Sequence, residues 1–455
     1  MKYVIIGNSA AGIGAIEGIR AAEAACAAKA ACAAKATGAA EAADLGGGQG
    51  EITVITNEAH HTYSRPLISY LLLGKVTEEN MKYRGDSFYS DNNVRLLRGA
   101  TAVKIDADNK RAVLLDGSSA PYDKLLIAAG SSPFTPPFEG LDTVKDKVTF
   151  MSLDDARKLD EMLTRKKDAS ALIIGAGLIG LKCAEGIAKR AAGITVADLA
   201  PGILSSILDE EGAAIVQKHI ESQTCRAGCI VFKLGRSVKK FENNTAVFDD
   251  GQTVNFDVLV LAAGVRANTS LLKGIAEIDR GIIVNSKSET SAPDIYAAGD
   301  CTQTLDVSSG QNKIMALLPN AYMQGECAGI NMAAGAAEKS FGKAMPMNAI
   351  GFFGLHIITA GNYTGDIYKE RKTKKTKQNA DGKKQTESYK KLFYSDNKLN
   401  GYILIGDVEK AGIYTSLIRE RTPLDSIDFA LVCEKPGLMA FTKEERMAKL
   451  GGGVS

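Results

Sequence analysis

The sequence predicts an α/β protein with two Rossmann-like units and a smaller C-terminal α+β region. Two observations predict the units: a short apolar strand leads directly into a glycine-rich loop at Gly7-Asn8-Ser9-Ala10-Ala11-Gly12, and again at Gly175-Ala176-Gly177-Leu178-Ile179-Gly180. A third observation sets the C-terminal region apart, because the pattern changes from about residue 336 to strand-like runs and one short helix. A strand, a glycine-rich loop and a helix together form the unit that binds the pyrophosphate of a dinucleotide.

The bulk properties of the 455-residue chain are those of a globular protein, with 45% hydrophobic and 24% charged residues. A formal net charge of +2 does not favour nucleic-acid binding. No apolar run approaches the roughly 20 residues that cross a bilayer, so we expect no membrane association. The chain enters a strand at its N-terminus, which leaves no room for an export signal and predicts a cytoplasmic location with reduced cysteines.

Eight cysteines are scattered along the chain. Cys225 and Cys229 are the close pair outside the alanine-rich stretch, and His219 is the nearest candidate for a further ligand. A structural zinc site needs four ligands. We therefore expect ordinary thiols and no metal site.

The first loop is expected to bind a dinucleotide through Gly7, Ser9, Ala10, Ala11 and Gly12. Gly7 permits the tight turn after the strand, and Ser9 stands where the second glycine is usual. The fingerprint also has an acid about 20 residues further on, which binds a ribose hydroxyl. Here that acid is Glu58, 46 residues after Gly12, because an insertion lies between them.

The insertion covers residues 21–50 and consists mostly of alanine. Alanine is the best helix former, so we expect the first helix to continue, to break near Thr37-Gly38 and to return through residues 46–48. Two interpretations stay open: a solvated helical excursion, or an arm on which a partner docks.

The second loop matches the fingerprint fully, with Gly175, Gly177 and Gly180. Asp198 lies 18 residues after Gly180, at the end of the next strand-like run. A carboxylate there accepts from the ribose hydroxyls and repels a 2′-phosphate. No arginine follows in Leu199-Ala200-Pro201, so we expect NAD(H) rather than NADP(H).

Three further segments place small residues after apolar strands: residues 122–130, ending in Ala129-Gly130; residues 256–264, ending in Gly264; and residues 291–300, ending in Gly299-Asp300. Their order around the two loops resembles the flavoprotein pyridine nucleotide–disulfide oxidoreductase superfamily, over essentially the whole chain outside the insertion. The resemblance implies a glutathione-reductase-like flavoprotein with three domains. They are an FAD-binding domain at 1–147 and 270–335, an NAD-binding domain at 148–269 and a C-terminal α+β interface domain at 336–455.

The resemblance also implies the roles of individual residues. Glu58 would bind the adenosine ribose of FAD, and Asp300, after Gly299, would hold the ribityl chain or a nearby phosphate. Ala129 and Gly130 would let the backbone lie close to FAD, and a backbone N–H near Asn320 and Ala321 would face the flavin ring. The expected NAD(H) site comprises Gly175, Gly177, Leu178, Ile179, Gly180, Asp198 and Gly264.

The stretch Tyr63-Ser64-Arg65-Pro66 is the most discriminating one. It resembles rubredoxin and ferredoxin reductases, whereas disulfide-reducing relatives carry a redox cysteine in this region, and this chain has no cysteine between Cys32 and Cys183. Arg65 and Pro66 are therefore expected close to the flavin. Relatives often have an aromatic residue at the position of Leu178 and a glutamate, near the nicotinamide, at that of Lys182.

These features together predict an FAD-dependent NAD(H) oxidoreductase. Its electrons would pass between NADH and an external iron–sulfur, rubredoxin-type or ferredoxin-type protein, or a partner subunit of a larger redox enzyme. We name no catalytic acid or base, because hydride transfer depends on positioning and on tuning of the ring. Two alternatives stay open: a peroxide-forming NADH oxidase, and a non-catalytic FAD-binding scaffold or redox sensor.

In the C-terminal region, residues 348–361 are strand-like, residues 391–406 predict a hairpin turning at Asp396-Asn397, and residues 411–419 predict a helix. In the family this domain often contributes to dimerisation, so a homodimer or a hetero-complex is possible. The lysine-rich stretch 369–391 is interpreted as a solvated hairpin tip or a disordered loop, or as a surface that steers an acidic redox protein.

Overall fold

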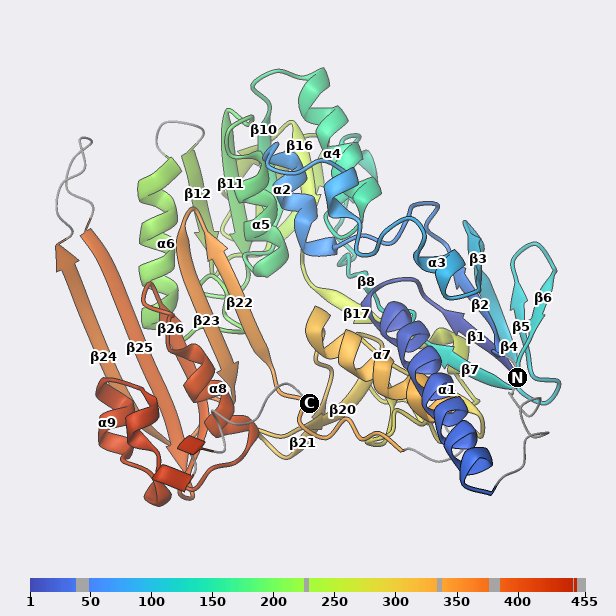
Figure 1. The fold of residues 1–455 in the computed structure, drawn as a ribbon. Coiled ribbons are helices and arrows are strands. Elements are labelled where there is room, and N and C mark those ends of the chain that lie inside the picture. Colours follow the sequence, from blue (N-terminus) through green and yellow to red (C-terminus); the bar gives the residue numbers. More distant parts are fainter. Residues whose placement is uncertain (38–48, 225–228, 334–337, 376–384, 445, 448–455) are drawn as a thin grey trace.

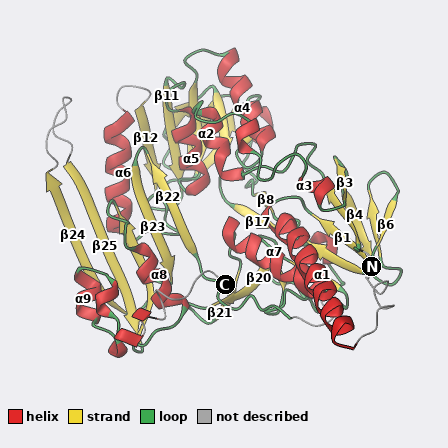
Figure 2. Cartoon of the chain, viewed as in Figure 1, coloured by secondary structure: helices red, strands yellow, loops and turns green. Residues whose placement is uncertain are grey.

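The structure is a computed structural model that describes residues 1–37, 49–224, 229–333, 338–375, 385–444 and 446–447. The described chain forms three parts, each around a five-stranded sheet (Figure 1). Helices flank the sheets, as Figure 2 shows. The α/β fold class predicted from the sequence is confirmed.

The first sheet is parallel and contains the strand that precedes the first glycine loop. Its order is β19-β7-β1-β2-β3, and each contact between neighbours is parallel. β19 comes from far along the chain, after the second sheet, which agrees with a first unit made of two chain segments. The strands are β1 (Lys2–Ile6), β2 (Glu51–Thr56), β3 (Val94–Arg98), β7 (Lys124–Ile127) and β19 (Ile295–Ala297).

Helices α1 (Ala10–Thr37) and α7 (Leu318–Ala333) lie side by side against this sheet (Figure 1). Glycines on both helices bring the two backbones close together. A Cβ on Gly14 would lie 2.3 Å from the carbonyl oxygen of Tyr322, and one on Gly325 would lie 2.0 Å from that of Ala11. This packing fixes the start of both helices at the same end of the sheet.

The alanine-rich insertion begins as a direct continuation of α1, which is described as far as Thr37, and the expected break near Thr37-Gly38 falls at the edge of the described residues. Its far end returns to the same helix: Gly50 donates to Glu23 at 2.8 Å, and its carbonyl accepts from Arg20 at 3.0 Å. Residues 27–32 of the helix are exposed. The described part of the insertion is thus a helix tied at its base, and both interpretations of it stay open. Its expected return through residues 46–48 lies outside the described residues.

The second sheet is also parallel, in the order β12-β11-β10-β16-β9. Helix α4 begins with a capping box in which Ser152 and Asp155 exchange hydrogen bonds, which fixes where the helix starts. The elements are β9 (Lys147–Thr149), β10 (Ser170–Ile174), β11 (Gly193–Asp198), β12 (Cys229–Leu234), β16 (Val258–Leu261), α4 (Leu153–Arg165), α5 (Leu178–Ile187) and α6 (Glu210–Thr224).

Smaller elements extend and connect the two units. β8 and β17 pair antiparallel and join them, and the remaining strands form small antiparallel or mixed sheets. They are β4 (Ala102–Asp106), β5 (Arg111–Leu114), β6 (Ser119–Pro121), β8 (Ser131–Pro133), β13 (Val238–Glu242), β14 (Thr245–Phe248), β15 (Thr253–Asn255), β17 (Val265–Ala267), β18 (Ile282–Ile283), β20 (Thr302–Asp306) and β21 (Gln311–Lys313), with short helices α2 (Ile68–Leu72) and α3 (Phe88–Asp91).

The C-terminal part is an antiparallel sheet in the order β22-β23-β26-β25-β24. One face shares a core with the second unit, and α8 and α9 cover the other. The expected hairpin and helix are present. The elements are β22 (Met347–Phe352), β23 (Leu355–Gly361), β24 (Asp366–Lys375), β25 (Gln385–Ser395), β26 (Lys398–Ile405), α8 (Ala411–Arg419) and α9 (Phe429–Glu434).

Of the two structural interpretations of residues 369–391, a hairpin tip or a disordered loop, the described residues agree with a hairpin and not with a disordered loop. These residues belong to β24 and β25, which pair from Asp366 with Tyr394 to Lys375 with Gln385. Cross-strand pairing extends the hairpin because alternate side chains find partners across the ladder. Residues 376–384, the expected tip, lie outside the described residues. The domain limits expected from the sequence stay a prediction.

Candidate functional site

The first glycine loop is a turn that side chains would block. Gly7 has a φ of +122°, and a Cβ there would lie 2.0 Å from the carbonyl oxygen of Ala128. A Cβ on Gly12 would lie 2.1 Å from the carbonyl oxygen of Gly7. The turn therefore delivers the chain into the N-terminus of α1, where unpaired N–H groups and the helix dipole favour an anion.

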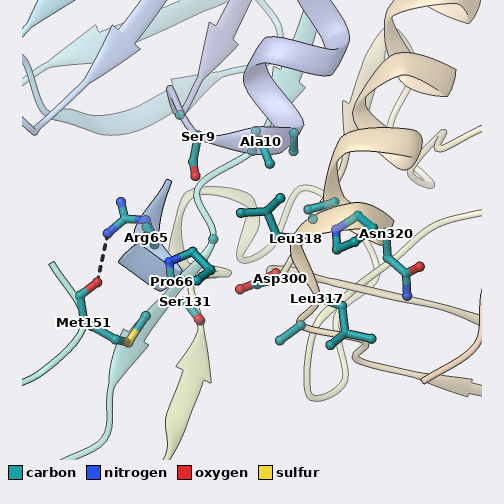
Figure 3. Close-up of a pocket in the computed structure, with 18 of the residues that line it drawn as sticks. Ser9, Ala10, Arg65, Pro66, Ser131, Met151, Asp300, Leu317, Leu318 and Asn320 are labelled. Atoms are coloured by element: carbon teal, nitrogen blue, oxygen red, sulfur yellow. Dashed lines mark hydrogen bonds between the residues drawn. The ribbon is translucent and has the colours of Figure 1, made fainter. Parts of the chain in front are cut away.

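A cavity of about 1130 Å³ opens in front of this loop and runs to the C-terminal sheet. Ser9 and Ala10 border it at the start of α1, with Arg65, Pro66, Asp300 and Asn320 around it (Figure 3). Most of the residues predicted for FAD line it: Gly7, Ser9, Ala10, Ala11, Glu58, Arg65, Pro66, Ala129, Gly130, Gly299, Asp300, Asn320 and Ala321. Gly12 does not, because its role is the turn itself.

Glu58 and Arg65 bind each other in this cavity. The Nη2 of Arg65 donates to Oε1 of Glu58 at 2.6 Å, and its Nη1 donates to the carbonyl of Met151 at 3.2 Å (Figure 3). Arg65 thus ties the first unit to the segment that leads into α4. The hydrogen bonds that Arg65 and Tyr63 donate to the Glu58 carboxylate both go to Oε1. The predicted hydrogen bond from a ribose hydroxyl would then fall to Oε2.

Asp300 lies at the end of the strand-like segment that contains β19, and its carboxylate borders the cavity (Figure 3). Burial raises the pKa of the Asp300 carboxyl, and the nearby Arg65 charge opposes this effect. A buried carboxylate is stabilised when it accepts hydrogen bonds from hydroxyl groups. The ribityl chain predicted at Asp300 carries such groups.

The start of α7 presents backbone N–H groups to the cavity. The N–H of Ala321 is already bonded to the carbonyl of Leu317 at 2.9 Å. The side chain of Asn320 donates to Met345 at 3.2 Å and points away from Asp300 in Figure 3. The contact between the backbone N–H of Asn320 and the flavin ring stays a prediction, and the N–H of Ala321 is less suited to it because it already has an acceptor.

The second glycine loop repeats the first turn, but its three glycines lie outside the cavity lining. A Cβ on Gly175 would lie 2.1 Å from the Ala262 carbonyl oxygen, and one on Gly180 would lie 1.9 Å from that of Gly175. A Cβ on Gly177 would meet no protein atom within 4 Å. The protein itself does not require glycine at 177, which fits a site where a ligand approaches the backbone. Gly264, at the end of the β16 segment, is also outside the cavity lining.

The carboxylate of Asp198 accepts hydrogen bonds from two backbone N–H groups, one of them in the second glycine loop. Its Oδ2 accepts from the N–H of Ala176 at 2.7 Å and its Oδ1 from that of Ala200 at 2.8 Å. Each carboxylate oxygen has a further lone pair, so these bonds orient the group and leave it able to accept from a ribose. Of the predicted NAD(H) residues, Leu178 and Ile179 line the cavity. Lys182, one turn further along α5, lines it too.

The sequence analysis missed the wall that the C-terminal sheet contributes. β22 and β23 line the cavity with Asn348, His356 and otherwise apolar residues, and the first unit adds His60, His61 and Thr62. Oγ1 of Thr62 and Nε2 of His61 are buried without a hydrogen-bond partner among the described residues. No local pattern in the sequence marks these residues, because the fold brings them to the site from distant segments.

Two negative findings hold for the described residues. No group of three or more His, Cys, Asp and Glu lies together in a way that could hold a metal ion. None of the described helices combines the length and the apolar character needed to span a membrane. Cys225, one of the close pair of cysteines in the sequence, lies outside the described residues.

Comparison with known proteins identifies the class that this fold and site define. The family model for pyridine nucleotide-disulphide oxidoreductases matches residues 1–325, and the chain belongs to this family. Residues 346–422 match the rubredoxin NAD+ reductase C-terminal domain. The protein is an oxidoreductase that uses FAD and NAD(H), as the sequence predicted.

Individual relatives show which kinds of flavoprotein the chain resembles. The chain is 32% identical to the epsilon subunit of the NADH-dependent phenylglyoxylate dehydrogenase of Aromatoleum evansii, covering 83% of this chain and 87% of that protein. It is 27% identical to the NADH-rubredoxin oxidoreductase of Clostridium acetobutylicum, covering 79% and 85%. The putidaredoxin reductase in a covalent complex with putidaredoxin has the same fold, with 20% identity, 99% coverage of both chains and a TM-score of 0.77. The chain spans less than half of two Bacillus subtilis relatives, an assimilatory nitrate reductase electron transfer subunit (46%) and a nitrite reductase (48%).

Proposed function

We propose that this flavoprotein passes electrons between NADH and an external iron–sulfur, rubredoxin-type or ferredoxin-type protein, or a partner subunit of a larger redox enzyme. FAD, when bound, supplies a ring that accepts two electrons from NADH and releases them one at a time. The chain's own residues bind the two nucleotides and bring their reacting ends together. The names of the relatives support a protein partner, since one is a subunit of a larger dehydrogenase and another acts with rubredoxin.

The observation that carries this proposal is the absence of a thiol from the cavity lining. The residues that line the cavity, all within the described chain, include no cysteine. Cys301 follows Asp300, yet it is fully buried, and burial raises the pKa of its thiol to about 12. Cys183 on α5 is also fully buried. Because thiol chemistry requires an accessible thiolate, neither is suited to receive electrons from the flavin, and the acceptor is external.

The lysine-rich hairpin gives little support to steering of an acidic partner. Five of its basic residues already have acidic neighbours: Lys369 and Arg371 bind Glu211, Lys372 and Lys390 bind Glu370, and Lys391 binds Asp209. Paired charges produce a weak field at a distance. The proposal therefore places no partner on this hairpin. The cytoplasmic location and a homodimeric or hetero-complex state remain predictions.

Anaerobic reduction tests the proposed function. The purified holoprotein is mixed with NADH, and the flavin absorbance is followed before rubredoxin, ferredoxin or oxygen is added. We expect bleaching by NADH and rapid recovery with one of the two carriers, with slow recovery in oxygen. Rapid recovery in oxygen with peroxide formation would identify an NADH oxidase, and no bleaching would identify a non-catalytic FAD-binding subunit.

A further inference from the structure

Helix α5 supplies the part of the second unit that borders the shared cavity. Leu178, Ile179 and Lys182 line it, whereas the three glycines of the second loop and Asp198 do not. For electrons to pass with a hydride, the reacting atoms of two rings must come within about 3–3.5 Å of each other. A nicotinamide held by the second loop must therefore enter the cavity along the face of α5 that carries Leu178 and Lys182, one helical turn apart.

The ammonium group of Lys182 is held firmly on this wall. Its Nζ donates to Oε2 of Glu185 at 2.7 Å and to the carbonyl of Gly351 at 2.6 Å. It also lies 5.3 Å from the ring centre of Tyr70 and 5.1 Å from that of Phe352. The side chain is 16% exposed. Two hydrogen bonds and two ring faces fix the position of the charge, so it does not swing out to solvent.

The counter-charge of Lys182 lies on the side away from the cavity. Glu185 does not line the cavity, its side chain is 11% exposed, and its Oε1 accepts from the N–H of Phe353 at 2.8 Å. Of the two members of the pair, Lys182 therefore lines the cavity and Glu185 does not, although both contact the C-terminal sheet. His356 is the titratable group of β23 on this side, opposite Gly351 in the strand ladder. The other charged or titratable groups of the cavity lining are Glu58, His60, His61, Tyr63, Arg65, Tyr70, Asp300, Lys343 and Arg419.

We propose that Lys182 makes the nicotinamide end of the cavity prefer the neutral, reduced ring to the cationic, oxidised ring. This inference rests on the proposed function. When NADH gives a hydride to the flavin, the C4–H bond of the ring breaks, both electrons leave with the hydrogen, and the ring becomes a pyridinium cation. A fixed ammonium group beside that ring weakens binding of the product while leaving the substrate almost unaffected. Lys182 is then a specificity-determining residue that favours NADH oxidation by promoting release of NAD+.

Equilibrium binding to the oxidised holoprotein tests this role without turnover. Three ligands are titrated by calorimetry: NAD+, with a cationic ring; 1,4,5,6-tetrahydro-NADH, a neutral analogue that cannot transfer hydride; and ADP-ribose, which has no ring. The variants are Lys182→Met, which removes the charge, and Lys182→Arg, which keeps it. Lys75→Met is the matched control, because Lys75 also lies over Tyr70, at 5.4 Å, but does not line the cavity.

We expect Lys182→Met to lower the ratio of the NAD+ dissociation constant to that of the neutral analogue by about 10-fold. Lys182→Arg and Lys75→Met should keep the wild-type ratio, and ADP-ribose affinity should be the same in all four proteins. The inference is overturned if Lys182→Met keeps the wild-type ratio. It is also overturned if all three ligands weaken equally, since that result assigns Lys182 a merely structural role. If the wild type binds none of the three ligands, the proposed function fails instead.

Discussion

The two glycine loops have the same turn and opposite surroundings. The first opens into the large cavity, and its own residues, together with Glu58, Arg65 and Asp300, line that cavity. The glycines of the second loop and Asp198 lie outside the cavity lining, a Cβ at Gly177 would meet open space, and Leu199 beside Asp198 is 73% exposed. The first loop thus borders a large cavity, whereas the acid and the glycines of the second loop lie at a more open surface.

This difference leads us to expect that the two nucleotides dissociate from the protein at different rates. A ligand enclosed by protein buries most of its surface and dissociates slowly, whereas a ligand on an open site exchanges with solvent. We infer that FAD is resident at the first loop and that NAD(H) comes and goes at the second. Lys182 lines the cavity where we expect the nicotinamide of the exchanging nucleotide to enter it.

The glycines offer the largest expected effect. Gly7→Ala places a Cβ against the Ala128 carbonyl and forces a positive φ on alanine, so we expect purified protein with almost no FAD. Gly177→Ala meets no protein atom, so it should keep its FAD and bind NADH about 10-fold more weakly. Flavin content per chain and NADH titration check both. If Gly177→Ala also lost its FAD, the separation of the two sites would be wrong; thermal unfolding of both variants reports whether they fold.

Substitutions of Asp198 and Glu58 should each weaken the binding of one nucleotide and spare the other. Asp198→Asn is expected to weaken NADH binding by about 10-fold, because a hydrogen bond to a charged group is lost, and to leave flavin content unchanged. Glu58→Gln should do the reverse, lowering FAD affinity and sparing NADH. Dissociation constants for each ligand in each variant provide the measurement. Equal losses for both ligands in either variant would show that the acids support the fold rather than one site each.

Asp300 predicts a pH dependence of the protein without FAD. Because the pKa of its carboxyl is raised in the folded state, Asp300 costs stability as pH rises from the ordinary aspartate value, about 4, through the raised value. Apo Asp300→Asn should therefore be more stable than the apo wild type at neutral pH, and the difference should vanish at low pH. Denaturant unfolding at several pH values measures it.

FAD binding should reverse the sign of that effect. The ionised carboxylate accepts from the ribityl hydroxyls in our proposal, so Asp300→Asn should bind FAD about 10-fold more weakly at neutral pH. A variant that bound FAD as well as the wild type would remove Asp300 from the proposed site.

The smallest effect is expected far from both loops, on the lysine-rich hairpin. Lys369→Glu breaks an exposed pair with Glu211, and exposed pairs contribute little. Turnover with an acidic carrier should change by less than about 2-fold at low salt. A large loss that disappears at high salt would restore the steering interpretation.

The sequence predicted the parts of the site that local backbone chemistry dictates. Gly7 and Gly175 are readable because a tight turn after a strand permits no side chain there, and α8 begins and ends at the expected residues. The pairing of Glu58 with Arg65 and the cavity wall of β22 and β23 were not readable. They depend on tertiary packing between segments that carry no motif. The sequence left residues 369–391 open between a hairpin and a disordered loop, because the cross-strand pairing that Glu387 and its neighbours provide is not visible in the lysine content.

The most direct test of the resident and exchanging nucleotides is retention. The protein is loaded with FAD and NAD+ and passed through a desalting column, and both nucleotides are then quantified in the protein fraction. We predict close to one FAD per chain and almost no NAD+. Loss of both nucleotides, or retention of NAD+ at a level equal to FAD, would contradict the account.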